Sequence, residues 1–299
     1  MKRLLVLVVL LVCENIIAAD ITKNGVGISI KGEVVEGDHL KLLNAIKDHE
    51  YSLSIGHEFR QILRAVERGE DPGGLKITPI KKEDFYIVGF ISIYSQGGDA
   101  SEAMKIGRLI RERKYGVNVG GVCFSSCVYI LAAGLSRNAP VEFTKVGIHR
   151  PFLTASTGED INIVMKQILK DSRIYFEEMN INPNLADDMF SIEPEKMKIL
   201  DKDELSLYRL NQVDMVYREE LEIKLAEKYG MTRIEFIQAQ KEYREDTKKY
   251  CITDDHLKII SDALESGNYS AFEDGSKELE ECIQNFKYKH GMFEKPIKN

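Results

Sequence analysis

The chain has 299 residues, enough for one large domain, or a domain with an appendage, around a sizeable buried core. Its formal net charge of −7 gives no general reason to expect a nucleic-acid partner. Local basic clusters, such as residues 108–114, are scattered along predicted helices and are interpreted as solvated faces.

Residues 1–19 have the pattern of a secretory signal peptide. Lys2 and Arg3 precede an apolar run over residues 4–12, and the small residues Ala18 and Ala19 offer a cleavage site before Asp20. We therefore expect cleavage after Ala19 and a periplasmic or secreted protein.

Two alternatives to cleavage are an uncleaved membrane anchor and a lipid attached to Cys13. The apolar run falls well short of the roughly 20 residues that a membrane-spanning helix needs. Lipoprotein signals have a small residue before the modified cysteine, whereas Val12 stands there in this chain. Cleavage is therefore favoured over both alternatives.

Cleavage would remove Cys13 and leave an even number of cysteines, which suits disulfide pairing in an oxidising compartment. Proximity in sequence pairs Cys123 with Cys127 and Cys251 with Cys282. From sequence, the alternative that some of them are free buried thiols stays open. Neither pair has a matching C-x-x-C or a histidine at ligand spacing, so no metal site is expected.

The first predicted elements after the signal are strands and helices. Residues 26–30 and 33–35 alternate well enough for one or two strands around Gly32. Asp38 is a predicted N-cap for a helix over residues 40–46. A second helical pattern over residues 51–70 ends at Pro72-Gly73-Gly74, and we interpret it as a surface elaboration.

The central stretch alternates strands and helices. In chain order the predicted elements are a strand over 85–94, a helix after Asp99, a strand over 115–122, a helix over 125–133 and a strand over 141–148. Residues 85–94 are almost continuously apolar, which is typical of a strand buried on both faces. Asp99 and Glu102 have capping-box spacing.

This βαβ order implies a parallel sheet. In such sheets, sites form outside the carboxyl ends of the strands. The glycine pair Gly97-Gly98 and the serine Ser125 both fall at that position.

The rest of the chain is mostly helical. A helix over residues 161–179 and a short one from 203 toward 208 are followed by charged helices over 219–229, 232–250, 255–265 and 277–288. The charged tail contains no catalytic constellation. We expect a signal peptide over 1–19, an α/β domain over 20–216 and a charged helical C-terminal extension over 217–299.

Three parts of the central stretch have the chemistry of a serine hydrolase. A serine hydroxyl needs a base, usually an imidazole, and His149 is the candidate base for Ser125. The backbone N–H groups of Gly98 and Ser126 could converge on a developing oxyanion. Each part alone is usually structural: a serine near a helix start is an N-cap, a lone histidine packs, and a glycine pair turns the chain.

Taken together, the motifs resemble a known family over residues 26–213. The motifs are Ser95-Gln96-Gly97-Gly98, Ser125 with Ala132-Ala133-Gly134, and His149-Arg150-Pro151. They resemble the Ser-Pro-Gly-Gly, nucleophile with Ala-Ala-Gly, and His-Gln-Pro motifs of the Clp protease proteolytic-subunit family, which has the Clp/crotonase fold. The Cys-x-Ser-x-Cys frame over residues 123–127 is more similar to secreted, Clp protease-like periplasmic proteins.

The resemblance implies an α/β fold of repeated ββα units with a mainly parallel sheet. It implies that Ser125 is the nucleophile, His149 the base, and Gly98 and Ser126 the oxyanion donors, because the spacing to Ala-Ala-Gly selects Ser125 over Ser126. The acid that orients the histidine matches best at Glu195. Asp201 is the fallback for this position.

The implied function is that of a secreted serine peptidase that cleaves peptides or unfolded protein segments. It would act without ATP, because a secreted chain cannot meet the ATP-driven unfoldase of the cytosolic protease. A homo-oligomer is expected, with no cofactor and no nucleic acid. The alternative is an inactive oligomeric binding or scaffold module, and an acyl-CoA enzyme of the same broad fold is disfavoured by the signal peptide.

Overall fold

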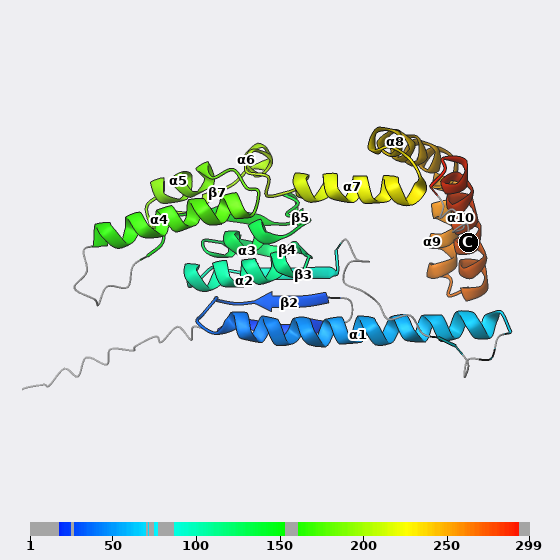
Figure 1. Ribbon diagram of the computed structural model, residues 1–299, viewed down its shortest axis with the longest axis horizontal. Coiled ribbons are helices and arrows are strands. Elements are labelled where there is room, and N and C mark those ends of the chain that lie inside the picture. The colour runs from blue at the N-terminus through cyan, green and yellow to red at the C-terminus, as the bar shows by residue number, and fades with distance from the viewer. Residues whose placement is uncertain are drawn as a thin grey trace, which may run out of the picture. The chain divides into compact units, whose positions relative to one another are not determined.

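The computed structural model describes residues 18–24, 27–69, 71, 75–76, 87–152 and 161–292 (Figure 1). The chain divides into two compact units, Met1–Asp214 and Met215–Asn299. Apart from Ala18 and Ala19, the predicted signal peptide lies outside the described residues, as do Cys13 and the predicted Pro72-Gly73-Gly74 break.

The first unit is built on a seven-stranded mixed sheet with the order β1-β2-β3-β4-β6-β7, in which β5 also pairs with β4. The strands are β1 (Asp20–Asn24), β2 (Gly27–Lys31), β3 (Gly89–Ser95), β4 (Tyr115–Phe124), β5 (Arg137–Asn138), β6 (Lys145–Ile148) and β7 (Lys198–Ile199). Pairings among β2 to β6 are parallel, whereas β1 and β7 are antiparallel to their neighbours. The predicted α/β class is confirmed.

The helices of the first unit are α1 (Asp38–Glu67), α2 (Ala100–Glu112), α3 (Cys127–Ala133), α4 (Ile161–Glu178), α5 (Asn184–Ser191) and α6 (Lys202–Leu207). Figure 1 shows α1 running alongside β2. The prediction of two helices over 40–46 and 51–70 was wrong. Residues 47–50 (Lys-Asp-His-Glu) contain no glycine or proline, so the helix continues through them.

The core is formed by the sheet and helices α1 to α6. From β3 it takes Ile91 and Ile93, and α3 is buried along its whole length. The prediction that the β3 strand is buried on both faces was wrong, because Phe90 and Tyr94 on the opposite face are 41% and 46% exposed. Period-2 alternation was hidden by apolar residues on both faces of this strand.

The predicted N-cap of α2 is confirmed. The side chain of Asp99 accepts a hydrogen bond from the Glu102 N–H at 2.8 Å. The second half of the predicted capping box is absent, because the buried Glu102 carboxylate accepts from the His39 N–H at 2.8 Å and pairs with the His39 ring. This contact fastens the start of α1 to the start of α2.

A buried ion pair holds the C-terminal end of the first unit. The Arg137 guanidinium, 2% exposed, donates to Asp214 and to the carbonyls of Ala132, Met179 and Arg209. Burial lowers the pKa of Arg137 to about 10, although the Asp214 carboxylate opposes that shift. Because every partner is internal, this network is structural.

The second unit consists of helices α7 (Met215–Tyr229), α8 (Arg233–Tyr250), α9 (Asp254–Glu265) and α10 (Tyr269–Lys289). The four predicted helices are confirmed, but α10 begins at Tyr269 rather than at residue 277. Thr232 caps α8 in a full capping box with Glu235. Its buried cluster is small, consisting of Ala226, Phe236 and Met292 with partly buried neighbours. Among the helices of both units in the described residues, none is long and apolar enough to cross a bilayer.

Candidate active site at the carboxyl ends of the strands

Ser125 lies in a sharp turn between the end of β4 and the start of α3. Its φ is 54°, in the left-handed region that a residue other than glycine adopts only when its surroundings fix it. Its N–H donates to the Gly147 carbonyl at 2.9 Å, and its carbonyl accepts from the Val128 N–H at 3.1 Å. The helix predicted to begin at Ser125 therefore begins at Cys127, and the serine stands in a strand-turn-helix elbow.

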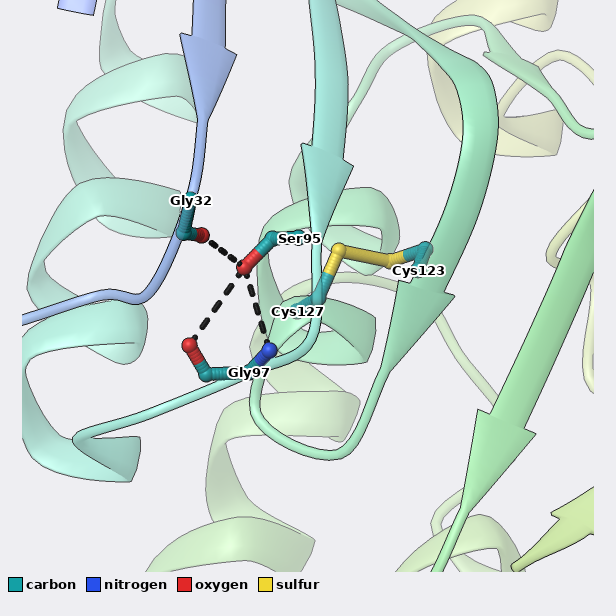
Figure 2. The surroundings of a disulfide bond; sticks show 5 residues. All are labelled: Gly32, Ser95, Gly97, Cys123 and Cys127. Carbon is teal, nitrogen blue, oxygen red and sulfur yellow. Dashed lines mark hydrogen bonds between the residues drawn. A yellow bond between two sulfur atoms is a disulfide. The ribbon is translucent and has the colours of Figure 1, made fainter. Parts of the chain in front are cut away.

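The disulfide between Cys123 and Cys127 spans this elbow. Its S–S distance is 2.07 Å and its Cα atoms are 5.2 Å apart, and both cysteines are fully buried. Figure 2 shows the bond joining the end of β4 to the start of α3 beside the glycine turn. The predicted pairing is confirmed here and at Cys251–Cys282, so these sulfurs are neither nucleophiles nor metal ligands.

The glycine turn after β3 is held by a buried hydroxyl. Ser95 Oγ donates to the Gly32 carbonyl at 2.6 Å and accepts from the Gly97 N–H at 3.1 Å (Figure 2). Gly97 and Gly98 have φ values of 110° and 131°, which favour glycine. A Cβ on Gly97 would lie 2.7 Å from Ser125 Cβ. The turn and the elbow are therefore in close contact.

Two backbone amides at this contact are unused. Within the described part of the chain, the N–H groups of Gly98 and Ser126 donate to no backbone or side-chain acceptor. A Cβ on Gly97 would lie 3.2 Å from Ser126 N, which shows how near the second amide is to the glycine turn. Gly98 is exposed, whereas Ser126 is buried, where a backbone N–H group is almost always paired. Both amides lie on residues that line one cavity, and both are available to a ligand there.

His149 directly follows β6 and is 6% exposed. Its ring packs edge-on against Phe152, with the centroids 5.4 Å apart. Burial lowers the pKa of His149, and the main chain of Arg150 and Pro194 partly offsets that shift. Its buried Nδ1 has no hydrogen-bond partner among the described residues. In the described structure, no hydrogen bond joins Ser125 Oγ to the imidazole ring.

Glu195, the predicted acid, is exposed in the turn that follows α5. It does not line the cavity described below, and no described residue shares a hydrogen bond or an ion pair with its carboxylate. The fallback, Asp201, caps α6 by accepting from the Glu204 N–H at 2.9 Å. At the level of β6, a Cβ on Gly147 would lie 2.7 Å from Met197 Sδ, so an apolar side chain lies beside this strand. The assignment of the acid stays a prediction.

One cavity of about 780 Å³ joins the other predicted parts: Gly98, Ser125, Ser126 and His149 all line it. Its remaining wall comes from residues 33–36 and from α2, α3, α4 and α5. Sequence reasoning missed the acidic members of this wall, Glu33, Glu36 and Asp171. Nothing in the local sequence patterns shows that residues 33–36 and α4 meet at this cavity.

The arrangement contains a serine at a strained elbow, an imidazole whose pKa is lowered by burial, and two amide N–H groups that have no acceptor among the described residues, all in one cavity. Such an arrangement is suited to acyl transfer. Within residues 18–24, 27–69, 71, 75–76, 87–152 and 161–292, no cluster of three or more His, Cys, Asp or Glu side chains could hold a metal ion.

A scan of the sequence against protein-family models found no match, and a search of curated proteins found no significant match.

Proposed function

We propose that the chain is a secreted, Clp protease-like serine peptidase that hydrolyses peptides or unfolded protein segments without ATP. The observation that carries the proposal is the left-handed conformation of Ser125 at a strand-to-helix elbow, in the same cavity as His149 and two unused amides. Strained backbone of this kind costs on the order of 1–3 kcal/mol and clusters at functional sites.

In the proposed reaction, Ser125 Oγ attacks the carbonyl carbon of the scissile peptide bond while a nitrogen of the His149 ring takes the hydroxyl proton. The resulting oxyanion accepts hydrogen bonds from the Gly98 and Ser126 N–H groups, each worth roughly 10²–10³ in rate. His149 then returns its proton to the leaving amine as the C–N bond breaks. Water, deprotonated by the same ring, hydrolyses the ester on Ser125 and restores the serine.

The environment of His149 supports its role as the base. Because burial lowers its pKa, the ring is neutral near pH 7 and can accept a proton. A direct Ser125–His149 hydrogen bond is not required before substrate binds, since such bonds are often long in unliganded enzymes.

We assign Glu195 as the orienting acid, on the resemblance of the sequence. Its neighbour Pro194 acts through its main chain on the His149 ring, and the buried Nδ1 of that ring is unpaired among the described residues. The proposal therefore includes a local rearrangement of the exposed turn that brings the Glu195 carboxylate to Nδ1.

Two disulfides indicate an oxidising compartment. A secretory signal ending at Ala19 accounts for that compartment. Cleavage there would remove Ala18, which forms a β-bridge with Glu33, and Ala19, which is buried. We expect the mature chain to begin at Asp20 in β1 and, from the resemblance, to form a homo-oligomer.

A fluorophosphonate probe tests the proposal, because it reacts only with an activated serine. We expect the purified protein to be labelled and Ser125→Ala to abolish labelling. Ser126→Ala is the matched control: it removes the neighbouring hydroxyl but keeps the backbone N–H, so labelling should persist. Labelling of Ser125→Ala at the wild-type rate would overturn the assignment.

The second candidate is an inactive oligomeric binding module. The exposed position of Glu195 favours it, because no described acid orients His149. A folded protein that is not labelled and cleaves no unfolded polypeptide would support this candidate.

A further inference from the structure

The cavity that contains Ser125 has an unbalanced charge. Four carboxylates line it, from Glu33, Glu36, Asp99 and Asp171, whereas none of its described lining residues is a lysine or an arginine. Arg150 and Lys170 adjoin lining residues in sequence, but neither is part of the described wall. The described wall of the cavity is therefore acidic.

These carboxylates have no cationic partners within the described residues. No ion pair involves any of the four in the described structure, and two lysines of α1 and α2, Lys41 and Lys105, pair with Asp38 and Glu102 instead. Asp99 accepts from a backbone N–H, and Asp171 accepts from the amide of Gln167 at 2.7 Å. Their negative charge is therefore not neutralised by a cationic side chain in the described structure and can interact with a ligand.

The acids lie next to the reacting groups. A Cβ on Gly98 would lie 2.9 Å from Glu33 Cγ, so this side chain lies over the proposed oxyanion donor. Glu33 and Glu36 belong to the segment whose Val34 exchanges backbone hydrogen bonds of 2.7 and 2.8 Å with Gly97 and Asp99. The acidic segment is thus fixed to the glycine turn.

A buried polar atom in the same wall points independently to a ligand. Ser126 is 2% exposed and His149 is 6% exposed, and both line the cavity. Ser126 Oγ has no hydrogen-bond partner in the described structure. Buried polar atoms without partners are rare in folded proteins and indicate that something else satisfies them.

We propose that this cavity selects cationic polypeptide segments, in which lysine or arginine side chains flank the residue held at Ser125. The inference deepens the peptidase proposal and rests on it for the cleavage step. Glu33, Glu36 and Asp171 supply the charge, and apolar wall residues such as Met104, Phe152, Ile168 and Met189 receive the side chains between the basic ones. A focused negative field raises the association rate of cationic ligands by about 10- to 1,000-fold and weakens with salt.

The test compares labelled peptides of equal length and apolar content that carry lysine, glutamine or glutamate at the same positions. Binding to the uncleaving Ser125→Ala protein is measured by fluorescence anisotropy at low and high salt, and cleavage is measured with the wild type. We expect the lysine peptide to bind at least about tenfold more tightly than the glutamate peptide, with the preference shrinking at high salt.

The charge variants locate the preference. Glu33→Gln, Glu36→Gln and Asp171→Asn together should abolish it, and Asp99 is left intact because it caps α2. The control triple, Glu142→Gln, Glu177→Gln and Asp203→Asn, removes the same charge from exposed positions outside the cavity and should keep it. Equal binding of all peptides, or equal losses in both triples, would overturn the inference.

The outcomes separate this inference from the peptidase proposal. Selective binding of the lysine peptide without fluorophosphonate labelling would retain the cationic site and remove the enzyme. Labelling of Ser125 without any charge preference would retain the enzyme and remove the cationic site.

Discussion

The two disulfides of this chain stand in contrasting regions. Cys123–Cys127 joins residues only 4 apart in sequence, inside the large core of the first unit and across the serine elbow. Cys251–Cys282 joins residues 31 apart in a helical unit whose buried cluster is small. The stabilisation by a disulfide grows with the loop that it closes, so the second bond should stabilise its unit more than the first.

A disulfide can therefore stabilise the local conformation of a site, as in the first unit, or the fold of a whole unit, as in the second. The first unit has a sheet, a buried Arg137–Asp214 ion pair and a continuous core, so it needs little help to fold. Its disulfide is placed where a strained serine must keep its conformation. The helical unit buries much less apolar surface, and its disulfide substitutes for the missing core.

The first and largest change in labelling is expected when the proposed base in the first unit is removed. His149→Gln removes the proposed base, so the rate of fluorophosphonate labelling should fall by about 10³-fold or more. Thermal unfolding of the variant is measured in parallel, because the buried His149 ring also packs against Phe152 and a loss of fold must be distinguished from loss of the base. A labelling rate within tenfold of the wild type would show that another group activates Ser125.

Removal of the Cys251–Cys282 bond tests the structural half of the contrast. The double change Cys251→Ala and Cys282→Ala should lower the free energy of unfolding of the helical unit by about 4 kcal/mol. Hydrogen exchange resolved by mass spectrometry measures each unit separately, and labelling of Ser125 should be unchanged. Hydrogen exchange in α7 to α10 at the wild-type rate would contradict the expected loss of stability.

Removal of the Cys123–Cys127 bond is the matched comparison. Cys123→Ala with Cys127→Ala should cost only about 2 kcal/mol of stability, because the closed loop is short. Labelling should nevertheless slow by about tenfold, since the released Ser125 can relax from its strained φ. Labelling at the wild-type rate in this variant would mean that the disulfide is not needed to keep Ser125 in its conformation.

The smallest expected effect is a pH shift. Burial lowers the pKa of His149, so the labelling rate should fall on acidification with a midpoint below the ordinary histidine value of about 6.5. The unfolded chain binds this proton more readily, so stability should decrease as pH falls from that value toward the native pKa. His149→Gln should remove that part of the stability loss, and a midpoint above 6.5 would contradict the burial argument.

Much of the fold could be predicted because its signals are local. Alternating strands and helices gave the α/β class, and the tail helices were recognised from their charged, amphipathic pattern. Features that depend on distant contacts were not predictable. Glu102 has a carboxylate at capping-box spacing, yet it binds His39 on another helix. Phe90 and Tyr94 look like core residues but lie on a sheet face that is left open.

The candidate site shows the same limit. Gly98, Ser125, Ser126 and His149 could be chosen from motif spacing, and they line one cavity. The acids of the cavity wall were missed, because Asp171 is one of three carboxylates on α4 and only the fold shows which of them lines the cavity. The orienting acid could not be identified from its position in the sequence, because no motif defines the turn that contains Glu195.

We propose above that Ser125 Oγ attacks the scissile carbonyl within hydrogen-bonding reach of the Gly98 and Ser126 N–H groups. A crystal structure of the protein after reaction with a fluorophosphonate tests it most directly. We predict a phosphorus atom bonded to Ser125 Oγ, with its phosphoryl oxygen about 2.7–3.1 Å from the nitrogens of Gly98 and Ser126. An adduct on a different residue, or a phosphoryl oxygen directed away from both amides, would contradict the claim.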